Sequence, residues 1–352
     1  MAMNVLETDW VELLDPKDPL LPYRKKGWDR FQAIGLPRPK QEAFQYVVKK
    51  QDLPKPARKK TVSASPTNGI AFVDGFFEET LSQIPSPMVC LPLESAIRSY
   101  GLFLQNRYSL ILKSEMDPYA ALNGALHGRG AFLYIPPQCK AALHLVQIHT
   151  SDAMATPRLH LYLGKNAELH LTQISQGASG FCNSVIDVVL DSGAKLSFLD
   201  EAEGHYQALR ATVKRDAQLK GVFLGKTLRH SLKIELAEEN SEAALYGLSQ
   251  LEKDAESHFH VCVEHAAPHT RSRQHFKSVL KDLSRFSFEG KIYVHPEAQK
   301  TEAYQLNNNL ILSDEASAYA KPNLEIFADD VRASHGATVG QLEEEEVFYL
   351  RS

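Results

Sequence analysis

Ligand-type side chains stand at every second position between residues 258 and 262. His258, His260 and Cys262 share one face if this segment is a β-strand, because the side chains of a strand alternate between its two sides. Imidazole and thiolate at that spacing could bind a soft divalent metal. The alternative is a strand with one polar and one apolar face that packs without any ion, and we favour this alternative. His265 and His269 lie beyond the strand, where no geometry predicts a role for them.

A glycine-containing segment, residues 221–227 (GVFLGKT), has some features of a phosphate-binding loop. Such a loop needs four residues between its glycines and a helix directly after it, so that successive backbone N–H groups wrap the phosphate. Here three residues separate Gly221 from Gly225, and the residues that follow alternate like a strand. We therefore expect no bound nucleotide.

Ionisable side chains also gather near the C-terminus. Asp329 and Asp330 invite a carboxylate-dyad interpretation, but adjacent residues of a strand point to opposite faces, so a turn role is favoured. His335 follows in a Ser-His-Gly-Ala-Thr run, and one of the two aspartates could work with it. Residues 343–346 (EEEE) are most simply the solvated start of a helix, where negative charge suits the N-terminal dipole. No Gly-x-Ser-x-Gly motif is present, and we do not expect an enzyme.

Composition limits the function classes. The chain has 352 residues, enough for two or more cores, and its net charge of −4 gives no support to a broad nucleic-acid-binding face. The basic residues 55–60 (KPARKK) fit a solvated linker. The start lacks a basic region followed by an apolar run, and no window approaches the ~20 apolar residues that span a bilayer. The cysteines form no Cys-x-x-Cys pair, so we expect reduced thiols in a cytoplasmic protein rather than a disulfide framework or a metal ligand set: Cys90, Cys139, Cys182 and Cys262.

Four regions position these side chains. Residues 1–68 are predicted to be a helical region that ends in a proline-containing linker from residue 51, and residues 69–131 a mixed α/β lead-in. Residues 132–342 are predicted to be β-structure, and residues 343–352 the start of a C-terminal helical region. The expected helices lie at residues 10–14, 28–34, 42–49, 93–104 and 120–127.

The β-region carries a weak internal repeat. A turn-and-strand phrase recurs around Ala167, Ala194 and Ala217, at spacings of 27 and 23 residues, and residues 240–245 and 314–318 are looser copies. A period in the twenties with short strands predicts the stacked coils of a parallel β-helix. The remaining alternative is a meander sandwich.

Two segments add detail to this prediction. Residues 228–236 alternate apolar and polar side chains, as a half-buried strand does. Asn307, Asn308 and Asn309 lie between short apolar segments and fit solenoid turn residues or an amide ladder.

The C-terminal residues resemble the signature of the SufB/SufD family, and most closely its SufD members. The specific matches are residues 322–331 (PNLEIFADDV) and 333–340 (ASHGATVG). Weaker matches extend the resemblance from about residue 25 to the end, at residues 35–37 (GLP), 134–136 (YIP), 264–272, 290–294 (GKIYV), 300–303 (KTEA) and 307–312.

This resemblance implies a mainly β chain built on a right-handed parallel β-helix, with an N-terminal α-helical region and a C-terminal helical domain. It implies a non-catalytic scaffold for iron–sulfur cluster assembly that pairs with a SufB-like subunit through the β-helix and with a SufC-like ATPase through the C-terminal helices. His335 corresponds to the family's candidate ligand for iron or a transient cluster. One histidine without local thiols cannot hold a cluster, so the site would be shared with the partner.

The sequence departs from the family pattern at two places. Ala333 stands where some relatives carry a cysteine, two residues before the histidine, so no thiolate assists His335. The chain ends at Ser352, where the C-terminal helical domain should begin. We therefore expect a truncated chain from which most of the SufC docking site is absent.

Two further function classes stay open. The chain could be a self-associating β-helix, a homodimer when alone, without any metal role. It could also be a polysaccharide-active β-helix enzyme, which would need a set of catalytic acidic or basic groups along one face. No such set is evident, and we expect neither nucleic-acid binding nor membrane insertion.

Overall fold

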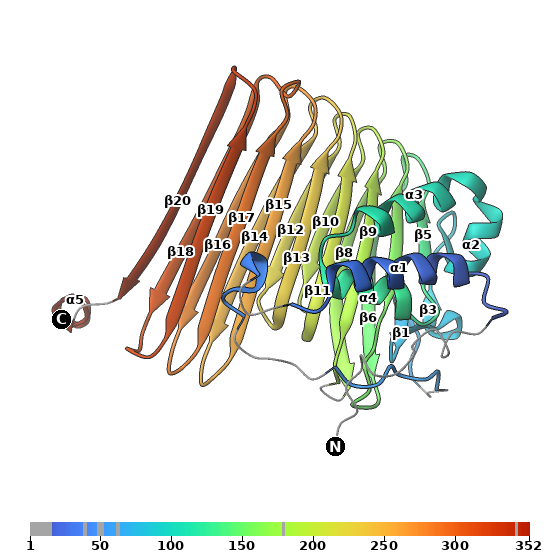
Figure 1. The fold of residues 1–352 in the computed structure, drawn as a ribbon, viewed down its shortest axis with the longest axis horizontal. Coiled ribbons are helices and arrows are strands. Elements are labelled where there is room, and N and C mark those ends of the chain that lie inside the picture. The colour runs from blue at the N-terminus through green and yellow to red at the C-terminus, as the bar shows by residue number, and fades with distance from the viewer. Residues whose placement is uncertain (1–15, 38–40, 48–52, 61–63, 178–179, 342–343) are drawn as a thin grey trace.

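Two long, mainly parallel β-sheets face each other through most of the protein (Figure 1). The computed structural model describes residues 16–37, 41–47, 53–60, 64–177, 180–341 and 344–352. From β5 onward, successive strands alternate between the two sheets, so each pair of strands is one coil of a parallel β-helix. The predicted β-helix is confirmed, and the meander sandwich is wrong because its neighbouring strands would be antiparallel.

The strands are as follows. The eleven-stranded sheet contains, in spatial order, β2 (Phe76–Phe77), β1 (Thr67–Val73), β6 (Lys140–His149), β8 (Glu168–Gly177), β10 (Lys195–Asp200), β12 (Gln218–Leu224), β14 (Glu242–Leu251), β16 (Arg271–Leu280), β18 (Thr301–Ile311) and β20 (Val331–Gln341), with β3 (Ser82–Gln83) beside β1. The nine-stranded sheet contains β4 (Val89–Pro92), β5 (Ala131–Ile135), β7 (Arg158–Leu163), β9 (Asn183–Leu190), β11 (Gly204–Val213), β13 (Thr227–Leu236), β15 (Glu256–His265), β17 (Arg285–Val294) and β19 (Ser317–Ile326).

The strand register reproduces the alanine spacing of the sequence. β8 and β10 pair with an offset of 27 residues and β10 and β12 with an offset of 23, as Glu168 faces Lys195 and Lys195 faces Gln218. Ala167, Ala194 and Ala217 are therefore stacked, fully buried, where the chain turns into the first sheet. The looser copy at residues 314–318 is different, because it leads into β19 of the other sheet.

Turn residues with a left-handed backbone stack along the same corner as these alanines. Asn166, Asp216 and Asn240 have φ angles of 57°, 58° and 59°, and Gly193 has 69°. Asparagine, aspartate and glycine adopt this conformation at little cost, which explains why each coil turns at these residues.

The core lies between the two sheets and is built from the inward side of every strand. The alternation predicted for residues 228–236 is observed in the second half of β13, where Leu232, Ile234 and Leu236 are buried in the core and Lys233 is exposed, whereas Leu228 to Ser231 are all buried. Further along, Phe276 lies between the rings of Phe259 and Phe288, with ring centroids 4.9 and 4.8 Å away.

Helices cover part of the outer face of the nine-stranded sheet (Figure 1). They are α1 (Leu21–Ile34), the 3-10 turn η2 (Glu42–Phe44), α2 (Leu93–Ser99), α3 (Gly101–Ser114) and α4 (Pro118–Leu126). The 3-10 turn η3 (Glu79–Leu81) lies beside β1 and β3 of the eleven-stranded sheet, and α5 (Glu344–Arg351) follows β20. Buried side-chain hydrogen bonds attach α4 to the sheet: Asn123 Nδ2 donates to the backbone oxygens of Pro157 and Asn183, at 3.0 and 2.8 Å. None of the helices within the described ranges is long and apolar enough to cross a membrane.

The helix predictions were partly confirmed. The helix expected at 28–34 begins earlier, at Leu21, and ends at Gly35 as predicted. The Gly35 N–H donates to Phe31 O, and the φ of 73° at Gly35 then turns the chain out of the helix. The helix expected at 93–104 is two helices that meet at Tyr100. The helix expected at 42–49 was wrong in its described part, which holds only η2. The helix expected at 10–14 lies outside the described residues.

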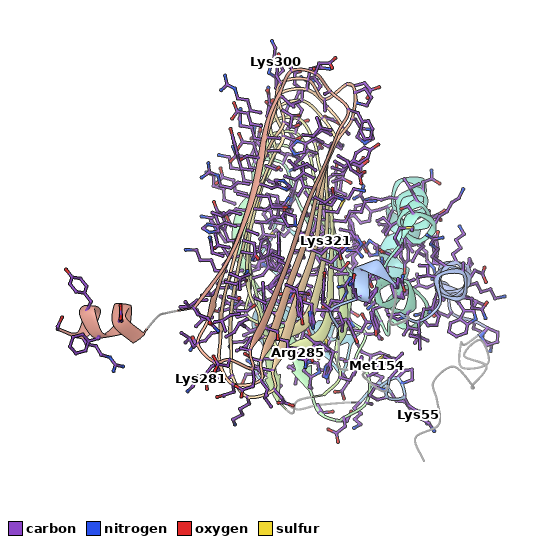
Figure 2. The ribbon with its side chains drawn as sticks, turned by 60° about the vertical axis from the view of Figure 1, so that its left-hand side comes forward. Lys55, Met154, Lys281, Arg285, Lys300 and Lys321 are labelled. Atoms are coloured by element: carbon purple, nitrogen blue, oxygen red, sulfur yellow. The ribbon has the colours of Figure 1, made fainter. Side chains whose placement is uncertain are left out.

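The proline-containing linker is attached to the β-helix. The backbone N–H of Ala57 donates to Met154 O, and the N–H of Met154 donates to Lys55 O, both at 2.9 Å. Figure 2 shows Lys55 and Met154 near each other below the helices.

Truncating Phe276 should destabilise the protein strongly. Phe276→Ala leaves a cavity between Phe259 and Phe288, and we expect it to lower the free energy of unfolding by about 3–5 kcal/mol. Phe348→Ala on α5, where the side chain is 76% exposed, is the matched control and should change it by less than about 0.5 kcal/mol. Urea denaturation measures both, and equal effects would contradict this account of the core.

Candidate functional site

His335 lies on the last strand of the eleven-stranded sheet. β20 pairs only with β18, and β19 pairs only with β17, so the outer edges of β19 and β20 have no strand partner within the described part of the chain. We call these two edges together the open edge; they form the end of the solenoid opposite helices α1 to α4 (Figure 1). Such edges present unpaired backbone N–H and C=O groups to a further strand.

The strand register places His335 at the end of a column of amide side chains. Gln274 of β16 pairs with Gln305 of β18, which pairs with His335. Register partners in neighbouring parallel strands point to the same side, so His335 belongs to the inward-facing set even though it is exposed. Val331 and Ala333, on the same side of β20, pack against the buried Ala303 cluster, which supports this orientation.

The hydrogen bonding of this column is incomplete at its outer end. Gln305 Nε2 donates to Gln274 Oε1 at 3.0 Å, whereas Gln305 Oε1 has no hydrogen-bond partner among the described residues. The column therefore ends in a buried acceptor on β18 and, on β20 at the open edge, an exposed imidazole.

Exposed apolar side chains accompany His335. Val339 is 51% exposed on the inward side of β20, beyond the buried Asn309, and Phe327 is 57% exposed just after β19. Leu306 and Tyr319 are also exposed, but on the outward sides of β18 and β19, where Tyr319 stacks on Tyr46 with ring centroids 4.5 Å apart. Large apolar side chains gathered at an exposed sheet edge are typical of a surface that another chain covers.

The aspartate pair near His335 belongs to a turn, as predicted. Asp330 O accepts a hydrogen bond from the Lys300 N–H at 2.5 Å, and the Asp330 N–H donates to Gln299 Oε1 at 2.9 Å. Asp329 lies in the same turn between β19 and β20.

Of the two alternatives for the three asparagines, the turn is wrong and hydrogen-bonded amides are observed. Asn307, Asn308 and Asn309 lie within β18, and Asn307 and Asn309 are buried between the sheets. Asn309 Oδ1 accepts from Ser278 Oγ at 2.8 Å, and Asn309 Nδ2 donates to Asn307 Oδ1 at 2.6 Å. These buried amides form a hydrogen-bonded network, which is why polar residues are tolerated in this strand.

The alternating histidines and cysteine lie on one strand, as predicted, but do not form a metal centre. His258 is buried, with Nδ1 2.7 Å from Ser287 Oγ and Nε2 3.1 Å from Glu256 Oε2. His260 and Cys262 instead line a cleft that is described below. No group of three or more histidine, cysteine, aspartate or glutamate side chains could hold a metal ion among the described residues.

The position predicted for His265 was wrong. His265 is the last residue of β15 rather than a residue beyond it, and it is buried between Thr270 Oγ1 and Ser272 Oγ at 2.7 and 2.8 Å. Burial lowers the pKa of His265 to about 3, so its imidazole stays neutral. Residues 221–227 connect two strands, β12 and β13, without a helix, so the phosphate-loop alternative has no anion site.

No sequence pattern indicated the cleft that lies beside α3. A cleft of about 720 Å³ lies between the outer face of the nine-stranded sheet, α3 and the segment that joins α3 to α4. In it, the Arg210 guanidinium bonds both oxygens of Glu115 at 2.8 Å. Its walls come from segments between residues 41 and 291, and the sequence contains no local pattern that links them.

Residues 146–352 match the protein family described as "SUF system FeS cluster assembly, SufBD core domain". The chain belongs to the SufBD family. An iron–sulfur cluster assembly SufBD family protein of Synechocystis is 30% identical over 310 residues, which are 80% of this chain and 68% of that protein. The iron–sulfur cluster assembly protein SufD of Escherichia coli is 37% identical over 224 residues, 60% of this chain and 53% of that protein.

The resemblance to SufD is thus confirmed for this SufBD-family chain. The chloroplastic protein ABCI7 of Arabidopsis thaliana is also similar, 28% identical over 257 residues, and 54% of its length is matched. The chain spans about half the length of SufD and ABCI7 and about two thirds of the Synechocystis protein.

The buried His265 should make the protein less stable in acid. Its pKa is about 3 in the folded protein and about 6.5 in the unfolded chain, so the unfolded state takes up a proton first as the pH falls. The free energy of unfolding is therefore highest above the pKa of the unfolded chain. It falls by about 2 kcal/mol between pH 7 and pH 5 because of His265. In His265→Asn the loss of unfolding free energy over this interval should be smaller by that amount. His144→Asn, at an exposed position, should leave the loss unchanged, and denaturation at both pH values decides.

Proposed function

We propose that this chain is a non-catalytic scaffold subunit for iron–sulfur cluster assembly in the cytoplasm. In this proposal it pairs with a SufB-like subunit through the open edge, and a cluster is built where the two meet. Membership of the SufBD family supports a role in cluster assembly. The observation that carries the site is the exposed His335 on β20, whose outer edge has no strand partner in the described part of the chain. Four free cysteines suit a reducing compartment.

The open edge supports the pairing step. β19 and β20 are ten and eleven residues long, so they offer two long rows of backbone donors and acceptors to a partner's strands. Val339 and Phe327 add apolar surface that pairing would bury. A partner with the same β-helical architecture could continue both sheets across the junction.

The position of His335 supports a ligand role that a partner completes. Imidazole is a reasonable ligand for ferrous iron, but one histidine cannot hold iron or a cluster by itself. The nascent cluster is cargo in this proposal, held between His335 and ligands of the SufB-like subunit. Coupling to a SufC-like ATPase is assigned to the helical region that begins with α5.

Replacing His335 should impair cluster assembly without impairing pairing. In His335→Ala we expect the visible absorbance of cluster on the chain co-purified with a SufB-like subunit and a SufC-like ATPase to fall about tenfold. His144→Ala removes an exposed histidine from β6, at the other end of the sheet, and should have no effect. Normal cluster build-up in His335→Ala would remove the metal role and favour a purely structural pairing.

A charge at the open edge should prevent pairing. Val339→Lys places an ammonium group where a partner would bury an apolar side chain, and we expect the affinity for the SufB-like subunit to fall by about tenfold to a hundredfold. Leu283→Lys replaces a similarly exposed apolar residue in the turn between β16 and β17 and should leave it unchanged. Light scattering on the chain alone tests whether the open edge pairs with a second copy instead. A homodimer that Val339→Lys converts to monomer would assign the open edge to self-association.

A further inference from the structure

The cleft beside α3 has the size and enclosure of a small-molecule site. Its volume of about 720 Å³ lies within the ~300–1,000 Å³ usual for such sites. Its floor is the outward side of β11, β13, β15 and β17. One wall is α3 and the link to α4, and residues 41–44 close one end. Packed strands and a helix thus supply most of the lining, so the cleft is preformed.

Most of the charged groups in the cleft are neutralised by neighbours. Arg210 is paired with Glu115 at 2.8 Å, and Glu289 is paired with Lys321 outside the cleft at 3.4 Å. Lys291 is paired with Glu325 at 2.8 Å, on the neighbouring strand β19.

Two cationic groups of β13 are not fully neutralised. Lys233 forms no ion pair and no hydrogen bond within the described part of the chain, although it lines the cleft. Arg229 is 3% exposed, and its Nε has no hydrogen-bond partner among the described residues. Its guanidinium lies 4.1 Å from the Phe44 ring centroid, with Asp117 Oδ2 3.7 Å from Nη2. A buried donor without an acceptor is expensive, and a ligand oxygen would satisfy it.

The positive charge near Cys262 disfavours a metal ion in the cleft. Cys262 lies in register between Lys233 and Lys291. Because Glu325 holds the Lys291 ammonium, Lys233 supplies the unpaired positive charge on this part of the sheet. Burial raises the pKa of Cys262 despite these lysines, which keeps the thiol protonated. A cation would be repelled here, whereas an anion would be attracted.

The remaining lining is apolar. Leu110 and Met116 are 64% and 70% exposed, and Ile111 and Phe44 lie beside them in the lining. Exposed apolar side chains that line a cleft gain free energy when an apolar body covers them.

We propose that this cleft binds a small organic anion, with its carboxylate or phosphate at Lys233 and its apolar body against Leu110, Met116 and Phe44. The proposal does not depend on the open edge or on His335, which lies on the terminal strand of the other sheet. The ligand class is an amphiphilic acid with one anionic group.

The test uses the full chain with 8-anilinonaphthalene-1-sulfonate, an apolar aromatic anion, as the probe. We expect one saturable site by fluorescence, competed by decanoate or by naphthyl phosphate, and the better competitor identifies the carboxylate or the phosphate class. Lys233→Met keeps the side-chain length and should weaken the probe roughly fivefold to tenfold. The uncharged analogue N-phenyl-1-naphthylamine should bind both forms equally.

Two controls place the probe in the cleft. Lys281→Met removes a lysine from a turn on the side of the solenoid away from the helices (Figure 2) and should bind the probe like the unaltered chain. Bound probe should also slow alkylation of Cys262, followed by mass spectrometry of its peptide, but not that of Cys139. If Lys233→Met and Lys281→Met bind the probe equally, or if Cys262 is not protected, the proposal is overturned.

Discussion

The whole structure depends on the pairing of parallel strands in register. Each coil hydrogen-bonds to the coil before it and the coil after it, and its inward side chains pack on those of the same neighbours. No coil is stable alone, because its apolar face is buried only by stacking. This explains why Ala167, Ala194 and Ala217 are fully buried: the corners of neighbouring coils cover them, as they cover Ser241, Thr270 and Thr301 at the equivalent positions further along. Stacking also leaves the coil at each end of the solenoid with one side that no further coil covers.

The two ends of the solenoid differ in how their sheet edges are covered. At the first end, short antiparallel strands border both sheets: β2 pairs with β1, and β4 pairs with β5. Helices α1 to α4 pack near the same end and cover the outer face of the nine-stranded sheet (Figure 1). At the other end, β19 and β20 keep unpaired edges in the described part of the chain. The covering helices also create the cleft, because α3 stands beside a sheet that continues past it.

Local sequence patterns predicted those features of the fold that depend on residues close together in the chain. The spacing of the alanines gave the coil length, and the alternation in residues 228–236 gave the inward face of β13. The asparagines at 307–309 were misplaced because amides usually mark turns, and only the neighbouring coils reveal that Ser278 and Phe276 O satisfy them. The cleft could not be predicted, since Arg210 and Glu115 are far apart in sequence and meet only through the packing of α3 and α4 on the sheet. His335 was found through its motif, whereas its exposure follows from its place on the last strand.

The side chains between the two sheets become more polar toward the open edge. Polar side chains suit an end of the solenoid that contacts water unless another chain covers it. Early coils place Leu196 and Phe198 between the sheets, whereas β18 places Gln305, Asn307 and Asn309 there. A purely apolar last coil would expose a large apolar surface whenever nothing covers it, and such a surface promotes aggregation. Amides tolerate water, and they can also hydrogen-bond to a partner that covers them. The unpartnered Gln305 Oε1 next to the register position of His335 therefore fits an interior that is completed from outside.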